Sequence, residues 1–132
     1  AGFIGSHICE RRLHDGLTKL GLGARIIGEE AAELDPGLLA DAGRGLVWLV
    51  DPLDGTANFA AGRAPFGMMV ALVDDGEPLA SWMLDPLAGR MCYAERGRGA
   101  TVDGRPARAG IDPDNKLIDR KPTDNMQPVD MH

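Results

Sequence analysis

The sequence has little cysteine, no long apolar run and no excess of basic residues, and these shortages exclude several classes of protein. Two cysteines, Cys9 and Cys92, among 132 residues cannot build a fold that depends on disulfide bonds. No apolar run approaches the roughly 20 residues of a membrane-spanning helix. The N-terminus lacks the basic and apolar segments of a secretory signal peptide. We therefore expect a cytoplasmic protein that does not interact with membranes.

The charge balance of the chain is acidic. It has 20 acidic residues against 14 Lys and Arg, a formal net charge of -6 and a pI near 4.9. An acidic surface repels the phosphates of nucleic acids and the headgroups of anionic membranes, so we expect neither as a partner. Apolar residues make up 44% of the chain, which is enough for the core of one domain or of part of a larger one.

The first third of the sequence predicts two helices on either side of a short strand. Apolar residues at helical spacing predict a helix from Ser6, as its N-cap, to Leu20. The apolar segment ARIIG, residues 24–28, predicts a buried strand that ends at a pair of glutamates. An Asp-Pro pair, typical of a helix start, predicts a short helix over residues 36–42.

The rest of the chain up to residue 110 predicts strands joined by tight turns. The segment GLVWLVD, residues 45–51, is apolar and β-branched, and we expect Pro52 to end this strand. From Phe66 onwards, apolar segments alternate with Asp-Gly turns, which predicts an antiparallel meander. We expect the methionines of these strands to fill the core.

Together these elements predict an α+β fold, a layered α/β sandwich with a mainly antiparallel sheet. The sequence divides into an N-terminal helical segment of uncertain origin, residues 1–23, an α+β core, residues 24–110, and a tail, residues 111–132. The tail is polar and interrupted by prolines, so we expect it to be mostly disordered.

Acidic residues follow both of the predicted strands that precede the meander. Asp51 is the last residue of the second strand, Asp54 follows it beyond Pro52, and Glu29 follows the first strand. Like charges this close repel each other unless a cation neutralises them or one carboxylate takes a proton. Mg²⁺ prefers carboxylate and carbonyl oxygens, so these acids are candidate Mg²⁺ ligands if the two strands are neighbours.

The residues that follow the acids are typical of an anion site. Gly55 lets the chain bend, and Thr56 and Ala57 can open a helical turn whose backbone N–H groups bind a phosphate. Such a site predicts hydrolysis of a phosphate ester by metal-activated water. The spacing alone leaves another interpretation open, because Asp-Pro and Asp-Gly are also common turn formers and Glu-Glu is typical of an exposed helix start.

The segment DPLDGTANF, residues 51–59, resembles the hallmark motif of the inositol monophosphatase family. IIGEE, residues 26–30, resembles the segment that carries that family's metal-binding glutamate. The similarity continues through the meander and covers about residues 24–109. The resemblance implies a sugar-phosphatase-like fold, dependence on Mg²⁺ and sensitivity to lithium.

The resemblance also assigns metal ligands to residues of this chain. It implies that Glu29 and Asp51 contact the principal Mg²⁺ together with the carbonyl of Leu53. It implies that Asp51 and Asp54 share a second ion. Glu30 would lie beside this site, and no role as a ligand is implied for it.

The same motif implies roles in binding water and phosphate. Thr56 would orient or help to activate the attacking water, and the backbone of Gly55 and Thr56 would hold the phosphate. The catalytic residues expected from the resemblance are therefore Glu29, Asp51, Asp54 and Thr56.

The sequence departs from the family pattern in two places. No segment resembles the Trp-Asp-x-Ala-Ala-Gly stretch that supplies another metal-binding aspartate in the family's second half. In DGLTKLG, residues 15–21, Gly21 occupies the position of an acid that pairs with the motif threonine in the family. We therefore expect a chain that is truncated to part of the first domain of such a phosphatase.

The N-terminus has a separate and shorter resemblance. Gly2 and Gly5 are similar to the last two glycines of the NAD-binding turn of extended short-chain dehydrogenases and sugar-nucleotide epimerases. In those proteins the turn follows a strand and cradles a pyrophosphate. The first glycine and the strand have no counterpart here, and binding of NAD is kept as a third hypothesis.

The leading hypothesis is a Mg²⁺-dependent phosphomonoesterase that hydrolyses a small phosphorylated metabolite such as inositol monophosphate. The alternative is a catalytically inert fragment of such a phosphatase that acts, if at all, through self-association or partner binding, because an absent second half would expose sheet surface. A homodimer is compatible with either hypothesis.

Overall fold

The computed structural model describes residues 2–35, 37–110 and 126–128. Its helices are α1 (Gly2–Lys19), α2 (Glu29–Leu34), α3 (Gly37–Asp41) and α4 (Thr56–Ala60). Its strands are β1 (Arg25–Gly28), β2 (Leu46–Asp54), β3 (Gly67–Asp74), β4 (Glu77–Asp85), β5 (Arg90–Glu95), β6 (Gly99–Val102), β7 (Arg105–Pro106), β8 (Arg108–Gly110) and β9 (Met126–Pro128).

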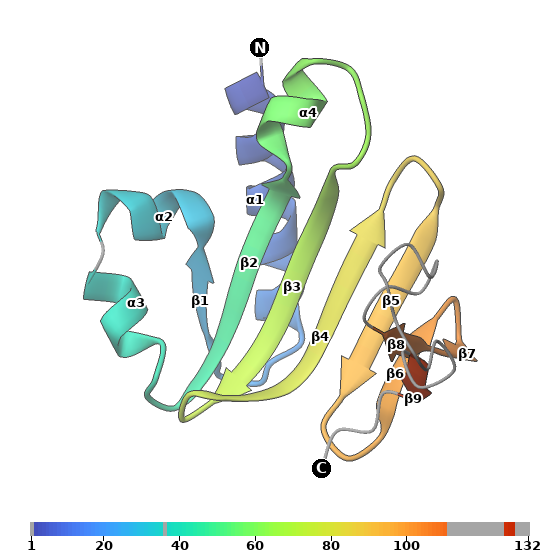
Figure 1. Ribbon diagram of the computed structural model, residues 1–132. Helices are drawn as coiled ribbons and strands as arrows, with labels where there is room; N and C mark the ends of the chain where they lie inside the picture. The colour runs from blue at the N-terminus through green and yellow to red at the C-terminus, as the bar shows by residue number, and fades with distance from the viewer. Residues whose placement is uncertain (1, 36, 111–125, 129–132) are drawn as a thin grey trace.

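Strands β1 to β7 form one seven-stranded sheet in the order of the sequence. β1 pairs with β2 in parallel, and all later neighbours pair antiparallel. Parallel neighbours need a crossover connection, and α2 and α3 supply it beside β1 (Figure 1). The predicted α+β fold with a mainly antiparallel sheet is confirmed.

Aspartate–glycine pairs close two of the hairpins. Asp75 and Gly76 join β3 to β4 with φ angles of 47° and 82°. Asp103 and Gly104 join β6 to β7 with φ angles of 51° and 75°. Positive φ at both central residues is typical of the two-residue turn whose twist matches that of antiparallel strands. The Asp-Gly turns expected from the sequence are therefore confirmed.

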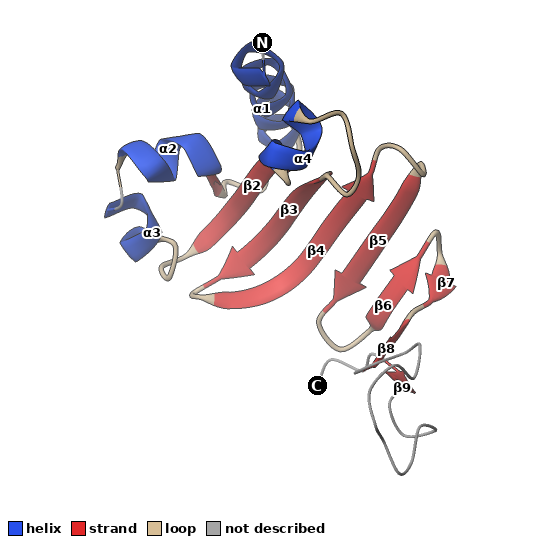
Figure 2. Ribbon diagram, turned by 45° about the horizontal axis from the view of Figure 1, so that its top comes forward, coloured by secondary structure: helices blue, strands red, loops and turns tan. Residues whose placement is uncertain are grey.

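The helices gather around one part of the sheet. α1 passes behind β2 in Figure 1 and contacts β1 and β2. Figure 2 shows all four helices around β1 to β3, whereas β5 to β7 lie away from them. None of the helices in the described ranges is long and apolar enough to cross a membrane.

The hydrophobic core lies in the first four strands. The buried apolar residues in the described part of the chain all belong to them: Ile27, Val47, Trp48, Val50, Val73 and Ala80. The ring of Trp48 lies 5.9 Å from that of Trp82, which in turn lies 5.2 Å from that of Tyr93. These three rings therefore pack in a row from β2 through β4 to β5.

Two predicted boundaries are wrong. α1 begins at Gly2, so Ser6 lies inside the helix and is not its N-cap. Pro52 does not end β2, which continues to Asp54. The pairing of β2 with β3 shifts register between Asp51 and Asp54. Proline has no N–H to donate, and such an irregularity is where a strand tolerates it.

The strand methionines fill the core only in part. Met83 is 50% exposed and Met91 is 39% exposed. Met91 belongs to β5, and the end of the sheet formed by β5 to β7 lies away from the helices in Figure 2. Met83 belongs to β4 and lines a cavity. Met68, Met69, Met83 and Met91 were all expected to be core residues, and this expectation is wrong for Met83 and Met91.

The sequence makes separate predictions for the two ends of the chain. Gly2 and Gly5 lie within α1 and have helical backbone. Of the tail over residues 111–132, the structure describes only β9, which pairs with β8 in a second, two-stranded sheet. The disorder expected for the rest of the tail concerns residues outside the described ranges.

Candidate active site

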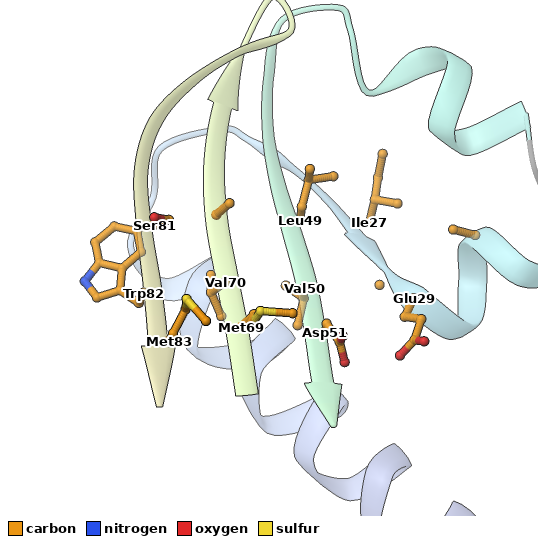
Figure 3. Close-up of a pocket in the computed structure, with 13 residues that line it drawn as sticks. Ile27, Glu29, Leu49, Val50, Asp51, Met69, Val70, Ser81, Trp82 and Met83 are labelled. Atoms are coloured by element: carbon orange, nitrogen blue, oxygen red, sulfur yellow. The ribbon is translucent and has the colours of Figure 1, made fainter. Parts of the chain in front are cut away.

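The carboxyl ends of β1 and β2 bring Glu29 and Asp51 to one cavity. The last matched pair of these parallel strands is Gly28 and Val50, and Glu29 and Asp51 are the next residues along the chain. Both line a cavity of about 410 Å³. Figure 3 shows their carboxylates at the same end of it. The two strands are neighbours, as the candidate metal site requires.

Away from these carboxylates the cavity is mainly apolar. Its lining includes Ile27, Leu49, Met69, Ala71 and Met83, together with the hydroxyl group of Ser81. An apolar wall lowers the local dielectric constant, and a carboxylate then interacts more strongly with a nearby cation than it does in water. Glu29 is exposed and Asp51 is half-buried, so the apolar wall acts mainly on Asp51.

The irregularity in β2 fixes the side chain of Asp51. The backbone N–H of Leu53 donates to Oδ1 of Asp51 at 3.0 Å. This hydrogen bond closes a local turn around Pro52, whose missing N–H could not have contributed to the ladder. Asp51 is half-buried, so the bond holds a carboxylate in a defined orientation beside the cavity.

Thr56 is linked to the same turn. Its Oγ1 donates to the carbonyl oxygen of Leu53 at 3.0 Å. A carbonyl oxygen has two lone pairs and the threonine hydroxyl oxygen can still accept a hydrogen bond, so both oxygens can take a further partner. The structure therefore joins two groups to which the family resemblance assigns metal binding and water binding.

Asp54 occupies a different position. It ends β2 opposite Gly67, is exposed, and is not among the residues that line the cavity. Within the part of the chain that the structure describes, no three Asp, Glu, His or Cys side chains are grouped so that they could hold a metal ion. Two of the three expected acidic ligands thus share a cavity, and the third lies outside it.

Two residues of the DPLDGTANF segment hold α4 in place, although no role was expected for them. Nδ2 of Asn58 donates to the carbonyl of Pro65 at 2.8 Å, and its Oδ1 accepts from Nε of Arg63 at 3.2 Å. The ring of Phe59 packs edge-to-face against Phe66 at 5.1 Å. The signal was present in the sequence, because both residues belong to the segment that carries the resemblance.

Comparison with known proteins covers most of the chain. The model of the inositol monophosphatase family matches residues 6–125. The chain belongs to this family. It is 38% identical to the inositol-1-monophosphatase of Rhizobium meliloti over 95 residues, and this alignment covers 65% of this chain and 36% of that protein. It is 43% identical to the histidinol-phosphatase of Mycobacterium tuberculosis over 70 residues, and this alignment covers 51% of this chain and 27% of that protein.

Solved structures of inositol monophosphatases share the fold. Inositol monophosphatase-II from Staphylococcus aureus superposes with a TM-score of 0.72 and 28% sequence identity, over 84% of this chain and 40% of that chain. The chain therefore spans well under half the length of the relatives that it matches. The family match also extends beyond residues 24–109, the range over which the resemblance was identified from sequence.

The donor groups at the cavity fit Mg²⁺. In proteins, Mg²⁺ is often held by one or two carboxylates and completes its coordination with waters and phosphate oxygens. Glu29 and Asp51 offer two carboxylates to one cavity, and the Leu53 carbonyl belongs to the turn that orients Asp51. A third acidic side chain is not needed for a site of this kind.

Gly55 is required by the turn that leads from β2 into α4. Its φ is 80°, and a Cβ atom at this position would lie 2.9 Å from the carbonyl oxygen of Pro65. We expect Gly55→Ala to lower the free energy of unfolding by more than the roughly 1–2 kcal/mol that left-handed backbone costs an L-residue. Urea unfolding followed by circular dichroism measures this loss.

Gly89→Ala is the matched control for Gly55→Ala. Gly89 also has positive φ, 62°, but no atom lies within 4 Å of a Cβ placed there. Gly89→Ala places a side chain on left-handed backbone but creates no close contact, so it should be the more stable of the two variants. Equal stabilities would show that the contact with the Pro65 carbonyl does not constrain the turn.

Proposed function

We propose that this protein is a Mg²⁺-dependent phosphomonoesterase that acts on a small phosphorylated metabolite such as inositol monophosphate. The observation that carries the proposal is the shared cavity of Glu29 and Asp51 at the ends of adjacent parallel strands. Membership of the inositol monophosphatase family supports it. The relatives named as phosphatases favour an enzyme over an inert fragment.

In this proposal, the acids of the strand ends hold the metal. Glu29 and Asp51, with the carbonyl of Leu53, would bind the principal Mg²⁺ in the cavity. The second ion that the family resemblance implies would lie outside the cavity, between Asp51 and Asp54. Bound Mg²⁺ supplies Lewis-acid stabilisation of the charge that develops on phosphoryl oxygens. The hydrogen bond from the Leu53 N–H to Asp51 leaves the carboxylate's orientation defined before any ion arrives.

Thr56 would position the attacking water. Its hydroxyl hydrogen is donated to the Leu53 carbonyl, so its oxygen is left as an acceptor for one O–H of the water. A water held in this way presents its own lone pair to the phosphorus atom. The backbone of Gly55 and Thr56, where the left-handed glycine turns the chain into α4, would contact the phosphate.

Two further properties belong to the proposal. We propose inhibition by lithium, as the family resemblance implies. We also propose a cytoplasmic location, supported by the two cysteines of the sequence, both of which are free thiols in the structure.

Release of inorganic phosphate tests the proposed function. Inositol 1-phosphate and histidinol phosphate are offered separately, with Mg²⁺ and with EDTA. We expect release from at least one ester that stops in EDTA, returns with added Mg²⁺ and falls when lithium is added. Release that persists in EDTA, or no release from either ester at saturating Mg²⁺, would contradict the proposal.

A further inference from the structure

The helix that begins with Glu29 has no capping side chain of its own. Gly28 is the N-cap residue of α2, with φ −91° and ψ 157°, and makes no side-chain cap hydrogen bond. The first backbone N–H groups of any helix have no partner within the helix, and a side-chain oxygen at the N-cap usually accepts from the second or third of them. In α2, these are the N–H groups of residues 30 and 31.

Glu10 of α1 lies where such a side chain would be. A Cβ atom built on Gly28 would clash with the Glu10 carboxylate, and would lie 3.0 Å from Cδ and 3.6 Å from Cγ of Glu10. The carboxylate therefore occupies the space of a missing side chain at position 28. Serine and aspartate, the common N-cap residues, carry their capping oxygen one or two bonds from Cβ, and so in the same region.

The register of the sheet agrees with this position of Glu10. Gly28 pairs with Val50, and a Cβ on Gly28 would point to the face that α1 covers. Because side chains alternate along a strand, Asp51, which follows Val50 in β2, turns to the other face and lines the cavity together with Glu29, the first residue of α2. Glu10 and the candidate metal ligands thus lie on opposite faces of the sheet at the same strand end.

We propose that Glu10 caps α2 from another helix and thereby positions Glu29, the first residue of α2. A carboxylate at this point also interacts favourably with the partial positive charge of a helix N-terminus. Glu29 is the first residue of α2, so the point at which the helix begins determines where Glu29 lies. A cap that fixes this point therefore also fixes the direction in which the Glu29 carboxylate enters the cavity. The inference rests on the proposed function only where it concerns the metal.

A double-mutant cycle between positions 10 and 28 tests the cap. Glu10→Ala should speed hydrogen exchange of the amides of residues 30 and 31 by about fivefold, the usual effect of losing an N-cap. Gly28→Ser alone should also destabilise α2, because its side chain meets Glu10. Together, the two changes should restore exchange to within about twofold of the parent, since the serine hydroxyl then supplies the cap oxygen.

Two variants control the cycle. Asp15→Ala removes an exposed acid from the same helix and should leave exchange in α2 unchanged. Glu10→Gln keeps an acceptor oxygen of the same size and should retain most of the protection. Equal exchange in Glu10→Ala and Asp15→Ala, or an effect of Gly28→Ser that adds to that of Glu10→Ala, would overturn the inference.

Mg²⁺ titration by calorimetry separates this inference from the proposed function. Glu10→Ala should raise the Mg²⁺ dissociation constant several-fold, and the double variant should return it towards that of the parent. If the parent chain binds no Mg²⁺, the metal site is wrong, and the amide exchange still decides whether Glu10 caps α2. If Mg²⁺ binding is intact and unaffected by Glu10→Ala, the positioning of Glu29 by Glu10 is contradicted.

Discussion

Asp51→Asn is expected to abolish Mg²⁺ binding while the fold stays intact. Asparagine keeps the Oδ1 acceptor that receives the Leu53 N–H, so the turn around Pro52 is preserved. It removes the negative charge that a hard divalent cation requires. Changes to groups that only support a metal ligand already cost 10–100-fold in affinity, and loss of a ligand charge should cost at least about 100-fold. Calorimetric titration with Mg²⁺ measures the loss.

Asp74→Asn is the matched control for this experiment. Asp74 is an exposed aspartate at the end of β3 and is not among the residues that line the cavity. Both variants change the net charge by the same amount, so an effect of overall charge would appear in both. Phosphate release should fall with Mg²⁺ binding in Asp51→Asn only. A parent-like Mg²⁺ affinity in Asp51→Asn would remove Asp51 from the site.

Local sequence patterns predicted the parts of the fold that depend on local physics. The Asp75-Gly76 and Asp103-Gly104 turns follow from the positive φ that these residues tolerate. The strand over residues 45–51 follows from its β-branched, apolar composition. The parallel pairing of β1 with β2 did not follow in the same way, because it depends on the crossover through α2. A helix start at the glutamate pair was expected only in the alternative interpretation, and α2 does begin at Glu29.

The predictions failed where a distant partner decides the outcome. Pro52 was expected to end β2, but pairing with β3 resumes at Asp54 after an irregularity. Asp51 lines the cavity, whereas Asp54, at the end of this extension, does not. Spacing in the sequence placed the acids close together, whereas the register with β3 determines which of them share a cavity.

The contact of Glu10 with Gly28 had no signal in the sequence for a related reason. The two residues are 18 positions apart and meet only because α1 packs against β1 and β2. Helix periodicity and strand alternation describe single elements, so neither predicts which residues of a helix and a sheet will meet. A glycine at the end of a strand is also common for turn formation alone, so Gly28 did not by itself indicate a neighbour.

Trp48→Ala is expected to cause the largest loss of stability. Trp48 is only 4% exposed, in the centre of β2. Its side chain borders a hollow of about 250 Å³ between the sheet and α1, lined by Leu13, Leu17 and Leu20. Truncation would enlarge this hollow rather than let the core close. Replacement of a buried aromatic by alanine costs about 3–5 kcal/mol, which is a large share of the about 5–15 kcal/mol that stabilises a typical domain.

Urea unfolding of Trp48→Ala, followed by circular dichroism, measures this loss against Leu87→Ala. Leu87 is 64% exposed, so its truncation should change stability by less than about 0.5 kcal/mol. Hydrogen exchange adds a more specific expectation, because Leu13 and Leu17 of α1 line the same hollow as Trp48. The amides of α1 should therefore lose more protection than those of β5. A Trp48→Ala variant as stable as Leu87→Ala would mean that the packing of α1 against the sheet does not depend on Trp48.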